Sequence, residues 1–303
     1  MLSAADDPQA GDVEIVVSDN SLEPETERVA NELLENWPGP ASYVRNVPGV
    51  GMVGNFNRCI ELSTGRWVQI LHDDDYLLPG GLEGMLAALN GIPEEQRVVL
   101  FGVRVVTDDG RQLRRQVSRR QLTLEPAAAL KRHLTWSSFV RFPAIVVRRD
   151  AYDHVGPFDD GVGGATDLDM WSRLFAAFGL HLDPTEAVAY VVHPHAATEQ
   201  MFTDDYIALI DQIFDRALAL GVLPEREVRR AQAHWYHQFI LAGTLRRLRA
   251  RERRAAGEVL RLLRHSELAD LPISWRWLPL RTAFSIGLGS SARGRPDDDL
   301  ELV

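Results

Sequence analysis

The sequence contains a single cysteine and no long apolar run, and both absences narrow what the protein can be. Cys59 cannot form an internal disulfide, and its place in an expected amphipathic helix favours a small core residue over a nucleophile. No apolar run approaches the roughly 20 residues of a membrane-spanning helix. The N-terminal stretch MLSAADDPQAGD lacks the basic region followed by a hydrophobic one that marks a secretory signal. We therefore expect a soluble, cytoplasmic protein, with peripheral contact at the inner face of the membrane left open.

An excess of positive charge is also absent. The chain has 43 acidic and 33 basic residues and a formal net charge of −10, which disfavours a general nucleic-acid binder. Arginines nevertheless crowd one C-terminal region. A solvated helix face is the first interpretation of this crowding, and a patch that contacts anionic lipid or a partner is the alternative. The residues concerned are Arg246, Arg247, Arg249, Arg251, Arg253 and Arg254.

The most informative stretch is RWVQILHDDDYLLP, at residues 66–79. Its apolar run at 67–72 predicts a strand buried on both faces, and Asp73, Asp74 and Asp75 begin where that strand ends. Ligands of open α/β sheets bind at the carboxyl ends of strands, and three adjacent carboxylates repel one another unless a cation is present. Oxygen ligands favour Mg²⁺ or Mn²⁺ over zinc. A solvated acidic turn is the alternative to this metal site.

The first half of the chain alternates strands with helices, which predicts a doubly wound α/β domain with parallel strands. Asp19 follows the first strand, so we expect it along the same sheet edge as the acidic run. At 303 residues, one such domain followed by a helical piece fits the length. The expected units are an α/β domain at residues 1–203, a helical extension at 204–288 and a disordered tail at 289–303. Strands are expected at 13–18, 43–45, 67–72, 97–106, 142–148 and 187–193, and helices at 22–37, 55–64, 82–89 and 166–179.

The helix that begins at TDLDMWSRL carries a second candidate carboxylate. Thr166 and Asp169 resemble an N-cap and its partner in a capping box, and Asp169 is also spaced for an ion pair with Arg173. Asp167 has no such structural explanation. It shares a face with Trp171 and lies in the first turn, where the helix dipole favours an ionised carboxylate. The Arg-rich segment RRQVSRRQLTLEP, in contrast, is interpreted as a solvated excursion.

In their order and spacing, these segments make the chain resemble a family 2 glycosyltransferase of GT-A fold over about residues 2–200. The matching segments are VEIVVSDNS, GVGMVGNFNRCIELSTGRW, ILHDDDYLLPG, FPAIVVRRDAYDHVGPFD, TDLDMWSRL and AYVVHPH. The resemblance implies a mixed, mainly parallel sheet with a helical C-terminal extension. It also implies roles for seven residues. These are Asp167 as catalytic base, Asp19, Asn57, Asp73 and Asp74 as nucleotide-sugar contacts, and Asp74, Asp75 and His193 as ligands of Mn²⁺ or Mg²⁺.

The implied reaction is inverting transfer of a sugar from a UDP- or dTDP-sugar to a hydroxyl of a glycan or lipid-linked acceptor, in cell-surface polysaccharide or glycan synthesis. One base and one metal suit a single displacement. The chain departs from the family pattern at His72, Thr166 and Val191, where many relatives have Asp, Glu and Arg. A nucleotide-sugar-binding protein without turnover is the alternative. A phosphatase with an Asp nucleophile is disfavoured, because the acidic run is followed by YLL.

The beginning of the chain also differs from the family pattern. Family 2 enzymes open with a strand and a helix ahead of the strand expected here at 13–18, and this chain has no such strand. Residues 2–4 resemble the end of the helix. Strands that lose a neighbour leave buried N–H and C=O groups unpaired, at about 1 to 3 kcal/mol each. We therefore expect Met1 to be an internal start of a longer natural protein, and the chain as given to be poorly soluble, inactive or gapped in its sheet.

Overall fold

The computed structural model describes residues 5–21, 23–193, 201–268, 271–272 and 275–289. The expected helix end at 2–4 and the expected tail beyond Gly289 lie outside these residues. None of the helices in the described residues combines the length and the hydropathy of a transmembrane span.

The first two strands form a small parallel sheet, and a helix follows each of them. The β-branched run in IVVSD gives the first strand, and the helix after it begins at Pro24, whose fixed φ suits a first helical turn. The two strands pair from Ile15 opposite Ala41 to Asp19 opposite Arg45. All four elements lie close to the positions predicted from the sequence. They are β1 (Ile15–Asp19), α1 (Pro24–Leu34), β2 (Ala41–Arg45) and α2 (Gly51–Leu62).

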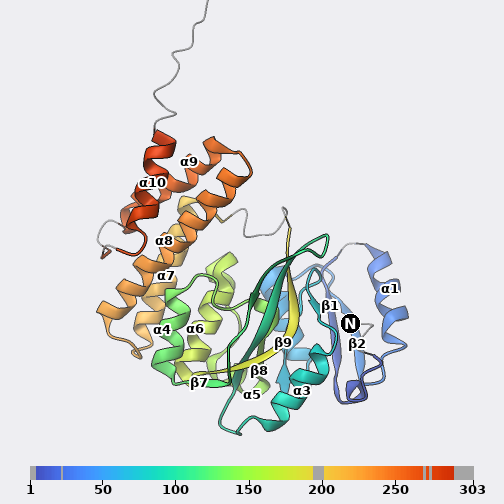
Figure 1. Ribbon diagram of the computed structural model, residues 1–303. Coiled ribbons are helices and arrows are strands. Elements are labelled where there is room, and N and C mark those ends of the chain that lie inside the picture. The colour runs from blue at the N-terminus through green and yellow to red at the C-terminus, as the bar shows by residue number, and fades with distance from the viewer. Residues whose placement is uncertain (1–4, 22, 194–200, 269–270, 273–274, 290–303) are drawn as a thin grey trace, which may run out of the picture.

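A larger sheet of seven strands holds the centre of the molecule (Figure 1). Its strand order is β3-β8-β5-β9-β4, with β6 paired to β5 and β7 paired to β9. β5 and β9 pair in parallel, whereas the other pairs in this sheet are antiparallel. The mixed α/β class is as expected, but the pairing is less parallel than expected. The strands are β3 (Trp67–Val68), β4 (Tyr76–Leu77), β5 (Val98–Thr107), β6 (Gln112–Gln116), β7 (Leu122–Leu124), β8 (Ile145–Arg148) and β9 (Leu180–Val192).

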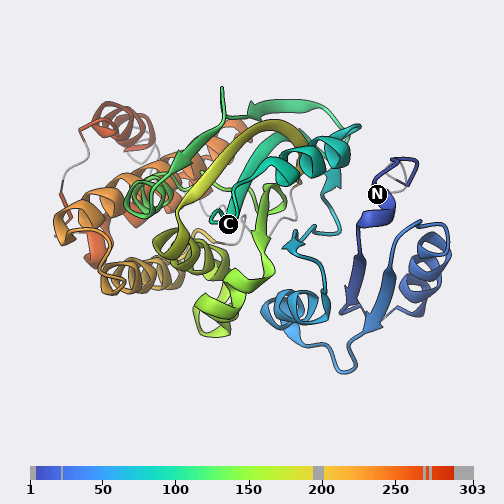
Figure 2. The same cartoon turned by 90° about the horizontal axis from the view of Figure 1, so that it is seen from below.

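The separation of the two sheets corrects the expected arrangement of the first half of the chain. Among the described residues, no backbone pairing joins β1 or β2 to the larger sheet. Figure 2 shows the blue N-terminal elements beside the larger sheet rather than within it. Asp19 and the acidic run therefore do not share one sheet edge.

The segments around the acidic run and the Arg-rich stretch also differ from expectation. The strand predicted at 67–72 ends at Val68, and the side chain of Gln69 donates to the carbonyl of Pro143 at 2.6 Å. The Arg-rich stretch contributes to β6 and β7 on the larger sheet, which was not predicted, but its arginines are exposed, as expected of a solvated surface. Two helices were not predicted, α4 (Pro126–Thr135) and α5 (Arg149–Val155).

Helices cover the larger sheet and continue its core toward the C-terminus. α3 (Gly81–Gly91) packs against β9 so closely that a Cβ at Gly81 would lie 2.2 Å from the carbonyl oxygen of Ala187. Trp171, Phe214 and Tyr236 are fully buried in one continuous apolar cluster with the strands. In Figure 1 the last two helices extend beyond the body of the molecule. The remaining helices are α6 (Thr166–Phe178), α7 (Asp204–Ala219), α8 (Glu225–Arg249), α9 (Arg253–Arg261) and α10 (Leu278–Gly289).

Candidate active site

The acidic run lies in the loop between β3 and β4, and its last carboxylate is anchored to β9. The side chain of Asp75 is buried, and its Oδ1 accepts a hydrogen bond from the backbone N–H of Val191 at 2.9 Å. Its other oxygen, Oδ2, is buried without a hydrogen-bond partner. Burial raises the pKa of Asp75 to about 7, with a further rise from the neighbouring carboxylates. A buried carboxylate oxygen with no partner is costly, and a cation would satisfy it.

The structure brings together a group of residues that can hold a metal ion. Ligand atoms of His72, Asp74 and Asp75 all lie within 4.8 Å of one another. His193, at the end of β9, places its Nε2 3.0 Å from Asp74 Oδ2. The expected metal residues therefore lie side by side, whereas Asp73 is exposed and is not part of the group. Carboxylates together with imidazole suit Mn²⁺ better than Mg²⁺, which prefers oxygen alone.

His72 is the member of this group that sequence reasoning missed as a ligand. Its ring lies 4.4 Å from that of Phe142 and 5.3 Å from that of Phe56, and its Nε2 is buried without a hydrogen-bond partner. Burial lowers the pKa of His72, against the opposing effect of Asp74 and Asp73. The neutral imidazole is the form that binds metals. The position of His72 inside the acidic motif could have indicated a ligand from the sequence, since His is the commonest metal-binding side chain.

Asp19 lies at the end of β1 in a local hydrogen-bond network. Its carboxylate accepts from the Ser21 backbone N–H at 2.7 Å, the Ser21 hydroxyl at 3.0 Å and the Tyr43 hydroxyl at 2.6 Å. Burial alone would raise its pKa, but these hydrogen bonds bring it below the usual value. A carboxylate has about four acceptor positions. Three of them are used within the protein, so at most one remains for a nucleobase.

Asn57, on α2, is bound to the backbone on both sides of its amide. Its Nδ2 donates to the carbonyl of Phe158 at 2.9 Å, and its Oδ1 accepts from the N–H of the same residue at 2.8 Å. This pair of hydrogen bonds holds the loop that leads into α6. In this structure the Asn57 side chain therefore positions the loop before the candidate base.

The start of α6 corrects the expected capping box. Ala165 is the N-cap residue, and no side chain caps the helix. A 3-10 segment at Asp160–Ala165 runs directly into the helix, so Thr166 already has helical dihedral angles and its hydroxyl donates to the carbonyl of Asp159 at 3.1 Å. Asp169 instead forms the expected ion pair with Arg173 at 2.8 Å.

Asp167 is partly buried in the first turn of α6. Its Oδ1 accepts from the backbone N–H of Leu168 at 2.7 Å, and burial raises its pKa to about 6. Ring contacts connect this turn to the acidic motif, since Trp171 lies 5.3 Å from Phe142, which in turn contacts His72. A carboxylate with a pKa near neutrality is suited to accept a proton from a hydroxyl. Ring contacts thus connect α6, the helix that carries the candidate base, to His72 in the candidate metal group.

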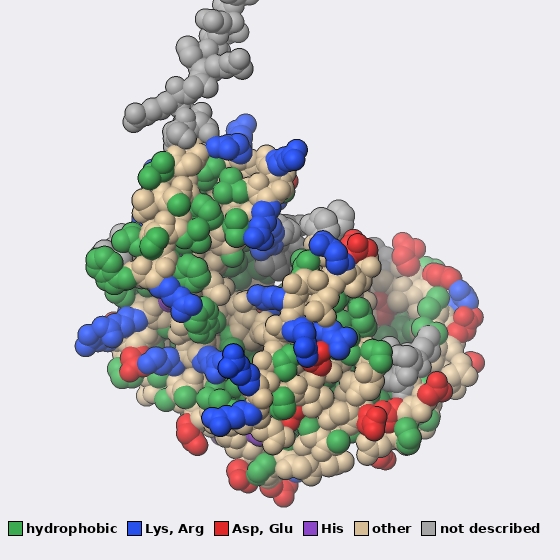
Figure 3. Space-filling view, in the orientation of Figure 1, with side chains coloured by type: hydrophobic (Ala, Val, Ile, Leu, Met, Phe, Trp, Pro, Cys, Tyr) green, Lys and Arg blue, Asp and Glu red, His purple; other side chains and the backbone are tan. Residues whose placement is uncertain are grey.

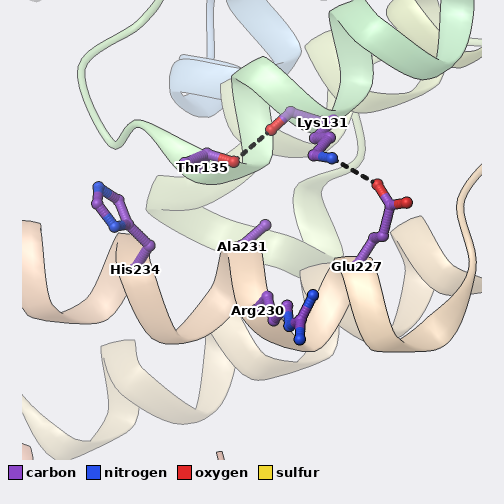
Figure 4. A pocket seen from close by; sticks show the side chains of 6 residues that line it. All are labelled: Lys131, Thr135, Glu227, Arg230, Ala231 and His234. Atoms are coloured by element: carbon purple, nitrogen blue, oxygen red, sulfur yellow. Dashed lines mark hydrogen bonds and ion pairs between the residues drawn. The ribbon is translucent and has the colours of Figure 1, made fainter. Parts of the chain in front are cut away.

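Figure 4 shows a pocket elsewhere in the molecule, between α4 and α8. An ion pair between Lys131 and Glu227, 2.7 Å long, crosses it. Thr135 donates to the carbonyl of Lys131 at 2.6 Å, so its hydroxyl is also engaged. The ion pair joins the two helices, and the pocket contains none of the residues predicted for the active site. Its lining residues are Lys131, Thr135, Glu227, Arg230, Ala231 and His234.

The sequence and the fold are similar to those of sugar-transferring enzymes. Residues 3–156, half of the chain, match the family model described as glycosyl transferase family 2. The chain therefore belongs to glycosyl transferase family 2, as its motifs predict. An uncharacterized protein of Mycobacterium tuberculosis, MT1568, is 27% identical over 240 residues, which cover 74% of this chain and 72% of that protein.

Solved structures confirm the GT-A fold. Residues 1–349 of TarS from S. aureus align with a TM-score of 0.56 and 15% identity over 100% of this chain and 88% of that one. The same fragment in complex with UDP gives a TM-score of 0.57 and 16% identity, again over 100% and 88%. The mannosyltransferase PcManGT from Pyrobaculum calidifontis, in complex with GDP-Man and Mn²⁺, aligns with a TM-score of 0.55 and 15% identity over 95% of this chain and 74% of that one.

Proposed function

We propose that the protein is an inverting glycosyltransferase that moves a sugar from a nucleoside-diphosphate donor to an acceptor hydroxyl. The observation that carries this proposal is the metal-binding group of His72, Asp74 and Asp75, which ring contacts connect to the helix of Asp167. In this proposal His72, Asp74, Asp75 and His193 hold Mn²⁺. The ion, when bound, stabilises the negative charge that develops on the departing diphosphate.

The base of the reaction is Asp167. Its carboxylate takes the proton of the acceptor hydroxyl as the hydroxyl oxygen attacks the anomeric carbon and the bond to the diphosphate breaks. One positioned base contributes a typical ~10²- to 10⁴-fold to such a step. Attack from the face opposite the leaving group inverts the anomeric configuration, and no covalent sugar intermediate is required.

The donor is proposed to be a UDP- or dTDP-sugar and the acceptor a glycan or lipid-linked sugar of cell-surface polysaccharide synthesis. The remaining acceptor position on Asp19 suits the imide N–H of a uracil or thymine base. The TarS fragment has been solved with UDP, which supports this choice, whereas PcManGT has been solved with GDP-Man. Guanosine donors therefore belong in the same screen.

A donor screen tests the function without knowledge of the acceptor. UDP-, dTDP- and GDP-sugars are incubated with the protein and Mn²⁺, and release of the nucleoside diphosphate is followed with water as the acceptor. For the active donor, the anomeric configuration of the freshly released sugar is read by NMR before it mutarotates. We expect release that stops in excess chelator, and an inverted sugar. Release unaffected by chelator, or a retained configuration, would contradict the mechanism.

One observation favours a second candidate function, binding of a nucleotide sugar without turnover. Within the described residues, neither β1, which carries Asp19, nor β2 is joined by backbone pairing to the sheet whose strands flank the acidic motif. A donor that needs both parts would then be held less rigidly for reaction. Calorimetric binding of a donor without release of nucleoside diphosphate, with or without added glycan, would favour this candidate.

The C-terminal helices are proposed to contact the membrane surface. Trp275 and Ile286 are 75% and 68% exposed, and Arg253 donates to the carbonyl of Gly287, next to Ile286, at 2.9 Å. The arginines at 249, 251 and 254 are exposed as well. Exposed apolar side chains flanked by cations suit an interface rich in anionic lipid. Co-sedimentation with phosphatidylserine vesicles, but not with phosphatidylcholine vesicles, is expected. Equal recovery with both lipids would argue for a solvated helix face.

A further inference from the structure

Two adjacent arginines on β6 point to opposite faces of the larger sheet. Arg115 lies opposite Arg104 on β5, and both form ion pairs with Glu186 of β9. Arg114 lies opposite Val105 of β5, which is itself opposite Tyr190 of β9. Side chains alternate along a strand, and residues opposite one another across strands share a face. Arg114 therefore lies on the Tyr190 face, away from the carboxylate that neutralises its neighbour.

A second arginine, from another segment, reaches the Tyr190 face. The guanidinium carbon of Arg141 lies 4.9 Å from the centre of the Tyr190 ring, and its Nε is buried without a hydrogen-bond partner. Among the described residues, no carboxylate lies within ion-pair distance of Arg114 or Arg141. Burial, and then the nearby Arg114, lower the pKa of Arg141 to about 10. The charge of Arg141 also lowers the pKa of the buried Asp75, but neither Arg141 nor the exposed Arg114 has a carboxylate within ion-pair distance among the described residues.

This pair of arginines adjoins the candidate active site at two points. Phe142, next to Arg141, contacts the ring of His72, and Val191, next to Tyr190, donates its N–H to Asp75. Figure 3 shows basic side chains around a hollow where the C-terminal helices meet the body of the molecule. Two guanidinium groups that lie close together beside buried groups repel each other, and a bound anion would offset this repulsion. The guanidinium group matches the geometry of phosphate oxygens.

We infer that Arg114 and Arg141, against Tyr190, form a binding site for a phosphate group of a substrate. Describing the ligand as a substrate rests on the proposed function, whereas the anion site itself does not. The phosphate can belong to the diphosphate of the donor or to a phosphate carried by the acceptor. Both sources present the same oxygens to the two guanidinium groups.

Calorimetry with inorganic phosphate tests the site on the full chain. Arg114→Gln and Arg141→Gln are each expected to weaken phosphate binding by about tenfold or more, because each removes charged hydrogen bonds. Arg115→Gln is the matched control, since it lies on the same strand but faces Glu186. It should bind phosphate like the wild type. The thermal unfolding of every variant is recorded, and Arg114→Lys, which keeps the charge, should recover part of the affinity.

Nucleotide titrations then separate the two sources. If the Arg114 and Arg141 variants bind UDP or GDP in Mn²⁺ more weakly in the same proportion, the site takes the donor phosphate. If nucleotide binding is unchanged and the wild type still binds phosphate when saturated with nucleotide, the site takes an acceptor phosphate. Phosphate binding that is absent in the wild type, or equal in all folded variants, would overturn the inference. If the wild type binds phosphate but binds no nucleotide, the proposed function is rejected and the phosphate site is not.

Discussion

Replacing Asp167 with Asn should remove sugar transfer and yet stabilise the folded protein at neutral pH. Burial raises the pKa of Asp167 from 3.8 to about 6, so the folded state disfavours the ionised form. A difference of about 2 pKa units corresponds to about 3 kcal/mol. This is an upper limit, because the side chain keeps some contact with solvent. Asparagine retains the acceptor oxygen for the Leu168 N–H and carries no charge, so the variant avoids this cost.

The stabilisation by Asp167→Asn should depend on pH, because it follows from the raised pKa of Asp167. The folded-state pKa of Asp167 is raised, so the carboxyl does not destabilise the fold below its unfolded pKa of 3.8, and its full cost is reached as pH rises through about 6. The advantage of Asp167→Asn should therefore be absent near pH 3.8 and about half developed at pH 5. It should be complete above about pH 7. Urea unfolding of both proteins at pH 5 and pH 8, with buffers matched in ionic strength, measures this difference.

The same substitution should also change the rate of sugar transfer. Asp167→Asn should lower kcat by a typical ~10²- to 10⁴-fold while the Kd for the donor stays nearly unchanged, because only the proton acceptor is lost. Asp169→Asn is the matched control. It breaks the buried ion pair with Arg173 and should lower stability by about 3 to 5 kcal/mol. The reasoning is refuted if Asp167→Asn turns over normally or is less stable than the wild type at pH 8, or if Asp169→Asn alone loses turnover at full stability.

Mn²⁺ should raise the melting temperature of the wild type and of Asp73→Asn but not of Asp74→Asn, because Asp74 belongs to the metal-binding group and Asp73 does not. If Mn²⁺ still raised the melting temperature of Asp74→Asn, the metal would bind elsewhere. Asn57→Ala should lower the urea midpoint and the free energy of unfolding, the latter by about 1 to 3 kcal/mol, since two hydrogen bonds to the loop before α6 disappear. An unchanged midpoint would show that other contacts hold the loop. Gly81→Ala should lower the free energy of unfolding by about 1 to 3 kcal/mol in the same assay, because its Cβ would lie 2.2 Å from the Ala187 carbonyl oxygen. If the variant is as stable as the wild type, α3 can shift away from β9.

The acidic motif could be recognised from sequence because its pattern is local. A short apolar run followed by carboxylates marks the end of a strand, whichever strands pair with it. The proximity of Asp74 to His193 could not be worked out from spacing, since it depends on β9 returning beside the motif 119 residues later. The resemblance to family 2 supplied that connection. His72 was not predicted as a ligand because it replaces the Asp of the family pattern, and the burial of its imidazole beside Asp75 is visible only in the fold.

The capping box failed because a sequence pattern does not specify what precedes a helix. Thr166 and Asp169 have the required spacing, but the 3-10 segment before them continues into α6 and makes Thr166 a helical residue. Its hydroxyl then donates to Asp159 instead of accepting from the helix. The i,i+4 pair of Asp169 and Arg173 was predictable, since it needs only the helix itself.

The Arg-rich stretch shows what strand pairing adds to a charge run. In sequence, RRQVSRRQ looks uniformly basic, and uniform charge usually means a solvated surface. Once the stretch pairs with β5, its period of two separates Arg115, which Glu186 neutralises, from Arg114, which faces Tyr190. The two arginines are chemically identical and adjacent, so the difference between them comes only from the register of three strands. Because register places Arg114 near Arg141, which adjoins the acidic motif, the fold supports the proposed phosphate site where the sequence alone indicates a solvated loop.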